Sequence, residues 1–136
     1  INEIEEYVGF SKEYNNFELQ NSLGEKKFDK SILIINQMFK NTKKNPIQVT
    51  LSVLHNFFTK LILLNSKNST NKLENIGIHP YFLKDYQLAA RNFPLNKSIQ
   101  IIHLLMQTDL KSKGVNKNRI NEKELMLDLV LDIMAI

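Results

Sequence analysis

The fold is decided by the stretch NPIQVTLSVLHNFFTKLILLN, which occupies residues 45–65. Large apolar side chains recur in it every three or four residues, which places them on one face of an α-helix. This stripe consists of Ile47, Leu51, Leu54, Phe58 and Leu61. Phe57, Ile62 and Leu64 widen the stripe, and a face this broad packs against more than one neighbour. The segment therefore predicts a central helix in a compact, all-α bundle.

Caps and breakers predict where this helix and the earlier helices begin and end. Pro46 suits the first turn of a helix, and Asn45 is the expected cap. Asn16 is expected to cap a short helix that ends at Gly24, and residues 2–8 are expected to form another. The chain therefore starts with short helices.

Stripes with the same spacing predict the other helices. In a helix over 27–41, the stripe consists of Phe28, Ile32, Ile35 and Phe39. In a long helix that begins at Pro94 or Leu95, it consists of Leu95, Ile99, Ile102, Leu105, Met106 and Leu110. Between them, Pro80 opens a helix whose aromatic residues are expected to lie in the core rather than to stack on bases: Tyr81, Phe82 and Tyr86.

The last helix, from about Asn121 to the end, is apolar nearly all round. Its apolar residues are Leu125, Met126, Leu127, Leu129, Val130, Leu131, Ile133 and Met134. A helix of this kind is either central to the core or covered by another subunit. The residues that we expect at a subunit interface are Leu127, Val130, Leu131 and Met134.

The composition fits one domain in a reducing compartment. The chain has 136 residues, of which 43% are hydrophobic, enough for one small core. We expect a single domain over 1–136, in which short helices within 1–24 lead into a main bundle over 26–136. The chain contains no cysteine, which excludes disulfides and thiolate sites and favours a cytoplasmic location. No signal peptide and no membrane-spanning stretch are expected.

The motifs of common active sites are absent from the sequence. Three histidines, His55, His79 and His103, are far apart and have no H-E-x-x-H pattern, and no glycine-rich phosphate loop occurs. Asp128 and Asp132 form an i, i+4 pair that suits acid–base chemistry or cation binding, or simply the polar stripe of the last helix. The polar stripe is the better interpretation, so we expect no catalytic site, cofactor or metal.

Two basic clusters raise the question of nucleic acid, since the net charge is +4. The first consists of Lys40, Lys43 and Lys44, and a solvated surface explains it adequately. The second consists of Lys111, Lys113, Lys117 and Arg119. Flexible cations in loops and at helix ends suit backbone phosphates, so this second cluster is a candidate DNA-phosphate contact.

An ordered set of short motifs runs through nearly the whole chain. It comprises Val8-Gly9-Phe10-Ser11, Tyr14-Asn15-Asn16-Phe17-Glu18-Leu19, Asn45-Pro46-Ile47, Gly77-Ile78-His79-Pro80-Tyr81-Phe82, Ala89-Ala90-Arg91-Asn92-Phe93 and Asp109-Leu110-Lys111-Ser112-Lys113-Gly114. In this order the motifs resemble the C-terminal third of the delta subunit of bacterial DNA polymerase III, with a Bacteroidetes-like style. Each motif is weakly specific, whereas the ordered set is fairly specific.

The resemblance implies a helical collar domain of about five to seven helices. Such a domain holds the clamp-loader pentamer together by contact with the gamma/tau and delta prime subunits, so that the parent subunit can open and load the sliding clamp. The resemblance also implies that an AAA+-like N-terminal domain, absent here, contacts the clamp. Some relatives offer DNA an aromatic side chain before the last helix. Residues 111–119 contain four cations and no aromatic residue, so contact with the phosphates of primed DNA is the remaining expectation. No membrane partner is implied. The alternative is a free-standing, basic, helical nucleic-acid-binding domain.

Overall fold

The computed structural model describes residues 14–40, 44–66, 73–114 and 121–136, and these contain helices and no strand. The elements are α2 (Asn16–Gly24), α3 (Phe28–Met38), α4 (Ile47–Asn65), α5 (Leu73–Ile76), η1 (Pro80–Phe82), α6 (Leu83–Asn92), α7 (Leu95–Ser112) and α8 (Glu122–Met134). The all-α class is confirmed. The short helix expected over 2–8 lies outside the described residues.

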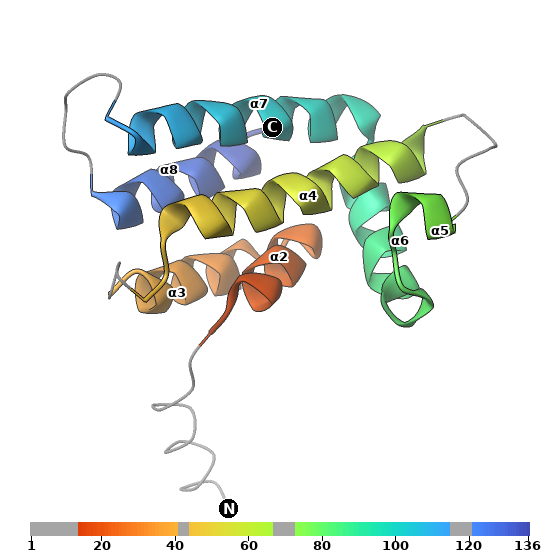
Figure 1. Cartoon of the computed structure of the whole chain (residues 1–136), viewed down its shortest axis with the longest axis horizontal. Helices are drawn as coiled ribbons and strands as arrows, with labels where there is room; N and C mark the ends of the chain where they lie inside the picture. Colours follow the sequence, from red (N-terminus) through yellow and green to blue (C-terminus); the bar gives the residue numbers. More distant parts are fainter. Residues whose placement is uncertain (1–13, 41–43, 67–72, 115–120) are drawn as a thin grey trace, which may run out of the picture.

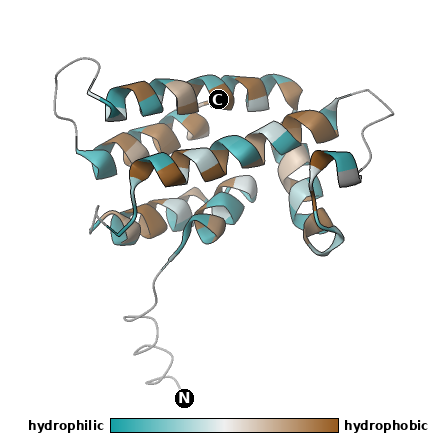
Figure 2. Ribbon diagram, in the orientation of Figure 1, coloured by the Kyte–Doolittle hydropathy of each residue, from teal (hydrophilic) through white to brown (hydrophobic). Residues whose placement is uncertain are grey.

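The central helix is α4, as its broad stripe predicts. It crosses the middle of the bundle, with α7 and α8 along one side, α2 and α3 along the other, and α5 and α6 at one end (Figure 1). Helix α8 packs against both α7 and α3. The stripe of α4 is fully or almost fully buried, and Figure 2 shows the hydrophobic residues that recur along this helix. The core therefore forms around α4.

Helix α4 is also the one described helix that is long and apolar enough to cross a membrane, with a mean hydropathy of 1.4. This differs from our expectation that no stretch of the sequence would meet that criterion. The bundle itself explains the apolar character, because α2, α6 and α7 all pack against α4. Its hydropathy is thus that of a core helix.

The helix starts differ from the expected ones by one residue. The cap of α2 is Asn15, whose Oδ1 accepts a hydrogen bond from the N–H of Glu18 at 2.9 Å. Asn16 instead accepts a hydrogen bond from the Thr50 hydroxyl at 2.7 Å, which ties α2 to α4. Asn45 does not cap α4 either, because its amide donates to the Met38 carbonyl at 2.8 Å. Both asparagines therefore join neighbouring helices.

Helix α3 buries only part of the expected stripe. Ile35 and Phe39 of that stripe are buried, whereas Phe28 and Ile32 are only half-buried. The buried face also includes Ser31, Ile34 and Met38. The reason is Ser31, whose hydroxyl lies 2.7 Å from the Ser22 hydroxyl. A small side chain with hydrogen-bond partners can be buried where two helices approach closely, so α3 turns this serine inward against α2.

At the other end of the bundle, α2 and α6 approach each other and α4 closely. A Cβ atom added at Gly24 would lie 2.9 Å from the Phe57 ring and 3.0 Å from the Ala89 Cβ. The Asn92 amide donates to the Gly24 carbonyl at 2.9 Å, and the Asn65 amide donates to carbonyls at the end of α6. Asparagine side chains therefore satisfy helix ends where the helices meet.

Candidate subunit interface

An extended apolar surface feature lies on α7. Four of its large apolar side chains are 40–54% exposed, and Ile102 between them is half-buried. We call this feature the α7 row, and it consists of Leu95, Ile99, Ile102, Met106 and Leu110. Because successive members are three or four residues apart, they are neighbours on one side of the helix. The row extends along most of α7.

The spacing in the sequence predicts one apolar stripe that combines these residues with Leu105. Of the predicted stripe only Leu105 is buried, and the buried face of α7 consists of Ser98, Ile101, Leu105 and Thr108. The Ser98 hydroxyl donates to the Phe93 carbonyl and the Thr108 hydroxyl to the Leu104 carbonyl, both at 2.9 Å. With these bonds made, burial of two small polar residues costs little.

Close packing explains why α7 buries its smaller face. Helices α4 and α7 form the most extensive helix pair in the described part of the chain. Small residues allow two helix axes to approach, since axis separation depends on the side chains at the contact. The larger apolar residues of the α7 row are therefore left at the surface. The 98, 101, 105 and 108 spacing was the signal in the sequence that could have revealed this second face.

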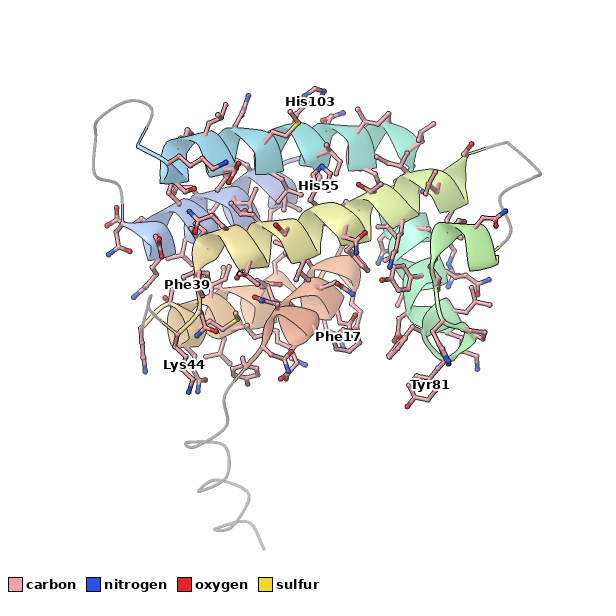
Figure 3. The ribbon with its side chains drawn as sticks, in the orientation of Figure 1. Phe17, Phe39, Lys44, His55, Tyr81 and His103 are labelled. Carbon is pink, nitrogen blue, oxygen red and sulfur yellow. The ribbon has the colours of Figure 1, made fainter. Side chains whose placement is uncertain are left out.

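A groove lies beside the row, between α4 and α7, with a volume of about 440 Å³. Figure 3 shows His55 between the two helices, while His103 projects from the outer side of α7. The groove is lined by Gln48, Leu51, Ser52, His55, Leu105, Met106, Asp109 and Lys113. Met106 belongs to both features, so the row and the groove form one surface. We call this surface the α4–α7 face.

The expected interface residues of α8 fall into two groups. Leu131 and Met134 are 54% and 45% exposed, and Leu127 is half-buried. These three form the α8 edge. Val130 has no exposed surface and belongs to the hydrophobic core, on the side of the helix that α3 and α7 cover. Val130 therefore stabilises the fold, and we do not include it in the candidate interface.

A row of carboxylates runs next to the α8 edge. Glu124, Asp128 and Asp132 follow one another at intervals of four residues, and all three are exposed. Such residues are neighbours on one side of a helix, and Asp128 is also three residues from Leu131. Within the described residues no group of three or more His, Asp or Glu side chains could hold a metal ion. The arrangement matches the polar stripe expected from the sequence.

Only part of the candidate DNA contact lies within the described residues. Lys111 is exposed in the last turn of α7, and Lys113 follows the helix end. The Lys113 ammonium lies 2.9 Å from the Asp109 carboxylate, in an i, i+4 ion pair. Cations at this end of a helix also stabilise the helix dipole. Both lysines thus have structural roles, while Lys117 and Arg119 lie outside the described residues.

The aromatic residues near η1 are only partly in the core. The His79 Nδ1 accepts a hydrogen bond from the Tyr81 N–H at 3.0 Å, so His79 caps η1. Contrary to the prediction, Tyr81 is 81% exposed and projects away from the bundle (Figure 3). Phe82 packs edge-on against both Tyr81 and Phe17, with centroids 5.0 and 5.3 Å apart. Tyr86 is buried, which raises the pKa of its hydroxyl against a smaller lowering by a hydrogen bond with Gln20.

Comparison with known protein families identifies the family of the chain. A family model described as DNA polymerase III delta subunit, C-terminal domain, matches residues 13–131. This range includes the described parts of α2 to α7 and most of α8. No curated protein and no solved structure matches the chain.

Proposed function

Because the chain belongs to the family of C-terminal domains of the DNA polymerase III delta subunit, we propose that it is an assembly module of the clamp loader. In this role it holds the loader pentamer together through contacts with the gamma/tau and delta prime subunits. It acts in DNA replication in the bacterial cytoplasm. Contact with the sliding clamp belongs to the N-terminal domain of the delta subunit.

The observation that carries this proposal is the exposure of large apolar side chains in ordered rows. The α7 row runs from Leu95 to Leu110, and the 15 steps between these residues correspond to about 22 Å along a helix. Its four exposed members and the α8 edge belong to helices that pack against each other. Apolar side chains in continuous rows, unlike single exposed ones, are typical of protein–protein contact surfaces. Packing against another subunit would bury them.

The geometry of the polar groups favours binding over catalysis. Asp128 and Asp132 lie on the exposed side of α8 and do not line the α4–α7 groove. The one carboxylate in the groove belongs to Asp109, which is paired with Lys113. A catalytic site needs several reactive groups that converge on a cavity. The groove offers a contact surface of mixed polarity instead.

The described cations give less support to a free-standing DNA-binding domain. Lys113 forms an ion pair with Asp109, which offsets its charge. Helix α8 has Glu122 and Glu124 in its first turn, which follows the second basic cluster in the sequence. Carboxylates close to a lysine cluster weaken its attraction for phosphates. Contact with primed DNA through Lys111, Lys113, Lys117 and Arg119 is therefore secondary to assembly in this proposal.

Co-elution of the chain with its cognate gamma/tau and delta prime subunits tests the proposal. We expect a complex on size-exclusion chromatography, and we expect Met106→Lys and Leu131→Lys to weaken it by more than about tenfold, as charges in an apolar contact do. Tyr81→Lys is the matched control, because Tyr81 is more exposed and lies in η1, outside α4, α7 and α8. A folded chain that binds neither subunit would overturn the proposal.

A further inference from the structure

Positive charge is concentrated in one stretch of the sequence. Residues 25–45 contain six lysines and two carboxylates, which gives this stretch a net charge of +4, equal to that of the whole chain. The rest of the chain therefore has as many cations as carboxylates. The stretch comprises α3 and the connections at its two ends, so the net charge of the domain lies at and around α3.

Helix α3 arranges part of this charge in a row along its outer side. Lys30, Leu33, Gln37 and Lys40 follow one another at intervals of three, four and three residues, so they are neighbours on one side of the helix. We call this row the α3 strip. The Lys40 N–H donates to the Gln37 carbonyl at 3.4 Å, which continues the helical path just beyond the last turn. Both lysines and Leu33 are exposed.

The two lysines of the strip keep their positive charge, since neither forms an ion pair with a described residue. The carboxylates of the stretch are engaged elsewhere. Glu25 pairs with Lys27 at 2.7 Å, and Asp29 borders the strip in the first turn of α3, where a carboxylate stabilises the helix dipole. In the second basic cluster, by contrast, Lys113 is paired with Asp109. The α3 strip is therefore the better suited of the two to an anionic partner.

The residue types of the strip favour duplex DNA among anionic partners. Lysine is depleted at contact surfaces between proteins, whereas it is common where proteins contact the nucleic-acid backbone. A membrane surface is disfavoured, because α3 buries its large apolar side chains in the core and cannot insert them into lipid. Single strands typically stack on exposed aromatic rings, and the strip has no aromatic residue. A duplex needs only phosphate contacts.

We propose that the α3 strip binds the phosphate backbone of duplex DNA without regard to base sequence. The ten steps from Lys30 to Lys40 correspond to about 15 Å along a helix. Phosphates of one strand follow each other about every 3.4 Å along the duplex axis, so the two lysines can contact phosphates about four or five base pairs apart. Helix α3 lies on the other side of α4 from α7 (Figure 1). The contact is therefore additional to assembly through the α7 row and does not depend on it.

Fluorescence anisotropy of a labelled duplex of about 20 base pairs, titrated with the full chain at about 50 to 200 mM salt, tests the contact. Lys30→Gln with Lys40→Gln removes both cations of the strip. This strip variant should bind more than about tenfold less tightly at about 50 mM salt, with a slope of log K against log salt that is smaller by about two. Lys30→Arg with Lys40→Arg should bind like the wild type, because it keeps both charges.

The matched control is Lys84→Gln with Lys97→Gln, which removes the same charge from α6 and α7. It should bind DNA like the wild type, and circular dichroism should show that every variant is folded, since surface lysines are replaced. A strip variant that binds no less tightly than this control would overturn the inference. So would a wild-type chain that leaves the duplex unbound at about 50 mM salt.

Two further results would place the contact elsewhere and also overturn the inference. Binding that is weakened only by Lys111→Gln with Lys113→Gln would assign the phosphate contact to the second basic cluster. A strip variant that binds DNA normally but loses the cognate gamma/tau or delta prime subunits would make α3 a protein contact. The Met106→Lys and Leu131→Lys variants test the assembly role separately, because they leave the strip unchanged.

Discussion

The orientation of α8 predicts very different effects for one substitution made at two places. Leu129 is 1% exposed and lies in the core, whereas Leu131, two residues further along the same helix, is 54% exposed. Leu129→Ala and Leu131→Ala remove the same atoms from the same helix. Any difference between the two variants in stability therefore reports burial.

The expected magnitudes follow from that burial. Leu129→Ala should lower the free energy of unfolding by about 2 to 5 kcal/mol, because it loses apolar contacts and leaves a cavity. A leucine loses three carbons, worth about 0.8 kcal/mol each when fully buried. Leu131 is slightly less than half buried, and water can occupy the space that its side chain leaves. Leu131→Ala should therefore lower the free energy of unfolding by only about 1 kcal/mol.

Urea denaturation followed by circular dichroism measures both values. We expect the midpoint to fall strongly for Leu129→Ala and slightly for Leu131→Ala, with an unchanged slope m in both. The binding assay should give the opposite order, with cognate subunits bound less tightly by Leu131→Ala. Equal destabilisation by the two substitutions would refute the placement of Leu131 at the surface and with it the α8 edge.

Three further predictions test the packing. Gly24→Ala should destabilise the fold by about 1 kcal/mol. Overpacking against Phe57 costs about 1 to 3 kcal/mol, and the higher helix propensity of alanine offsets about 1 kcal/mol of this. A variant that is more stable in urea denaturation would contradict this close approach. Asn15→Ala should cost about 1 kcal/mol through loss of the α2 cap, and an unchanged urea midpoint would disprove the cap. Burial raises the pKa of the Tyr86 hydroxyl above 10.0, so the unfolded state ionises first and stability should fall as the pH rises through about 10. Thermal unfolding of Tyr86→Phe should show a smaller decline over that pH range, and an identical decline would count against the raised pKa.

Much of the fold follows from helical spacing. The broad stripe of residues 47–61 predicts a central α4, and the structure buries that stripe against α2, α6 and α7. At the end of α5, Gly77 has a φ of +83°, a conformation that is typical of a glycine that ends a helix. Large apolar residues at regular intervals are a strong signal when only one face of the helix carries them.

The sequence was misleading where a helix has two possible inner faces. Helix α7 has large apolar residues on one side, and on another side it has Ser98, Ile101, Leu105 and Thr108. The side that packs against α4 is the one with the small residues. Hydropathy alone favours the first side, because it does not include the hydrogen bonds that Ser98 and Thr108 make to their own backbone. The hydrogen bonds of Ser31 likewise allow α3 to bury a serine beside Ile35, which belongs to the expected stripe.

The spacing of the α7 row predicts a helix, but it does not show which side of that helix faces the core. Only the packing of α7 against α4 shows that the row lies at the surface. The α8 edge was predicted because its helix has more apolar residues than one core face can use. The position of α8 against α3 and α7 determines that Val130 is buried and Leu131 is exposed.

The mass of the complex formed with cognate subunits tests the central claim most directly. The chain is mixed with its gamma/tau and delta prime subunits, and the assembly is weighed by native mass spectrometry beside the Met106→Lys and Leu131→Lys variants. We predict an assembly that contains one copy of the wild-type chain and loses it with either variant. A folded wild-type chain that stays outside every assembly would contradict the proposed role in holding the loader together.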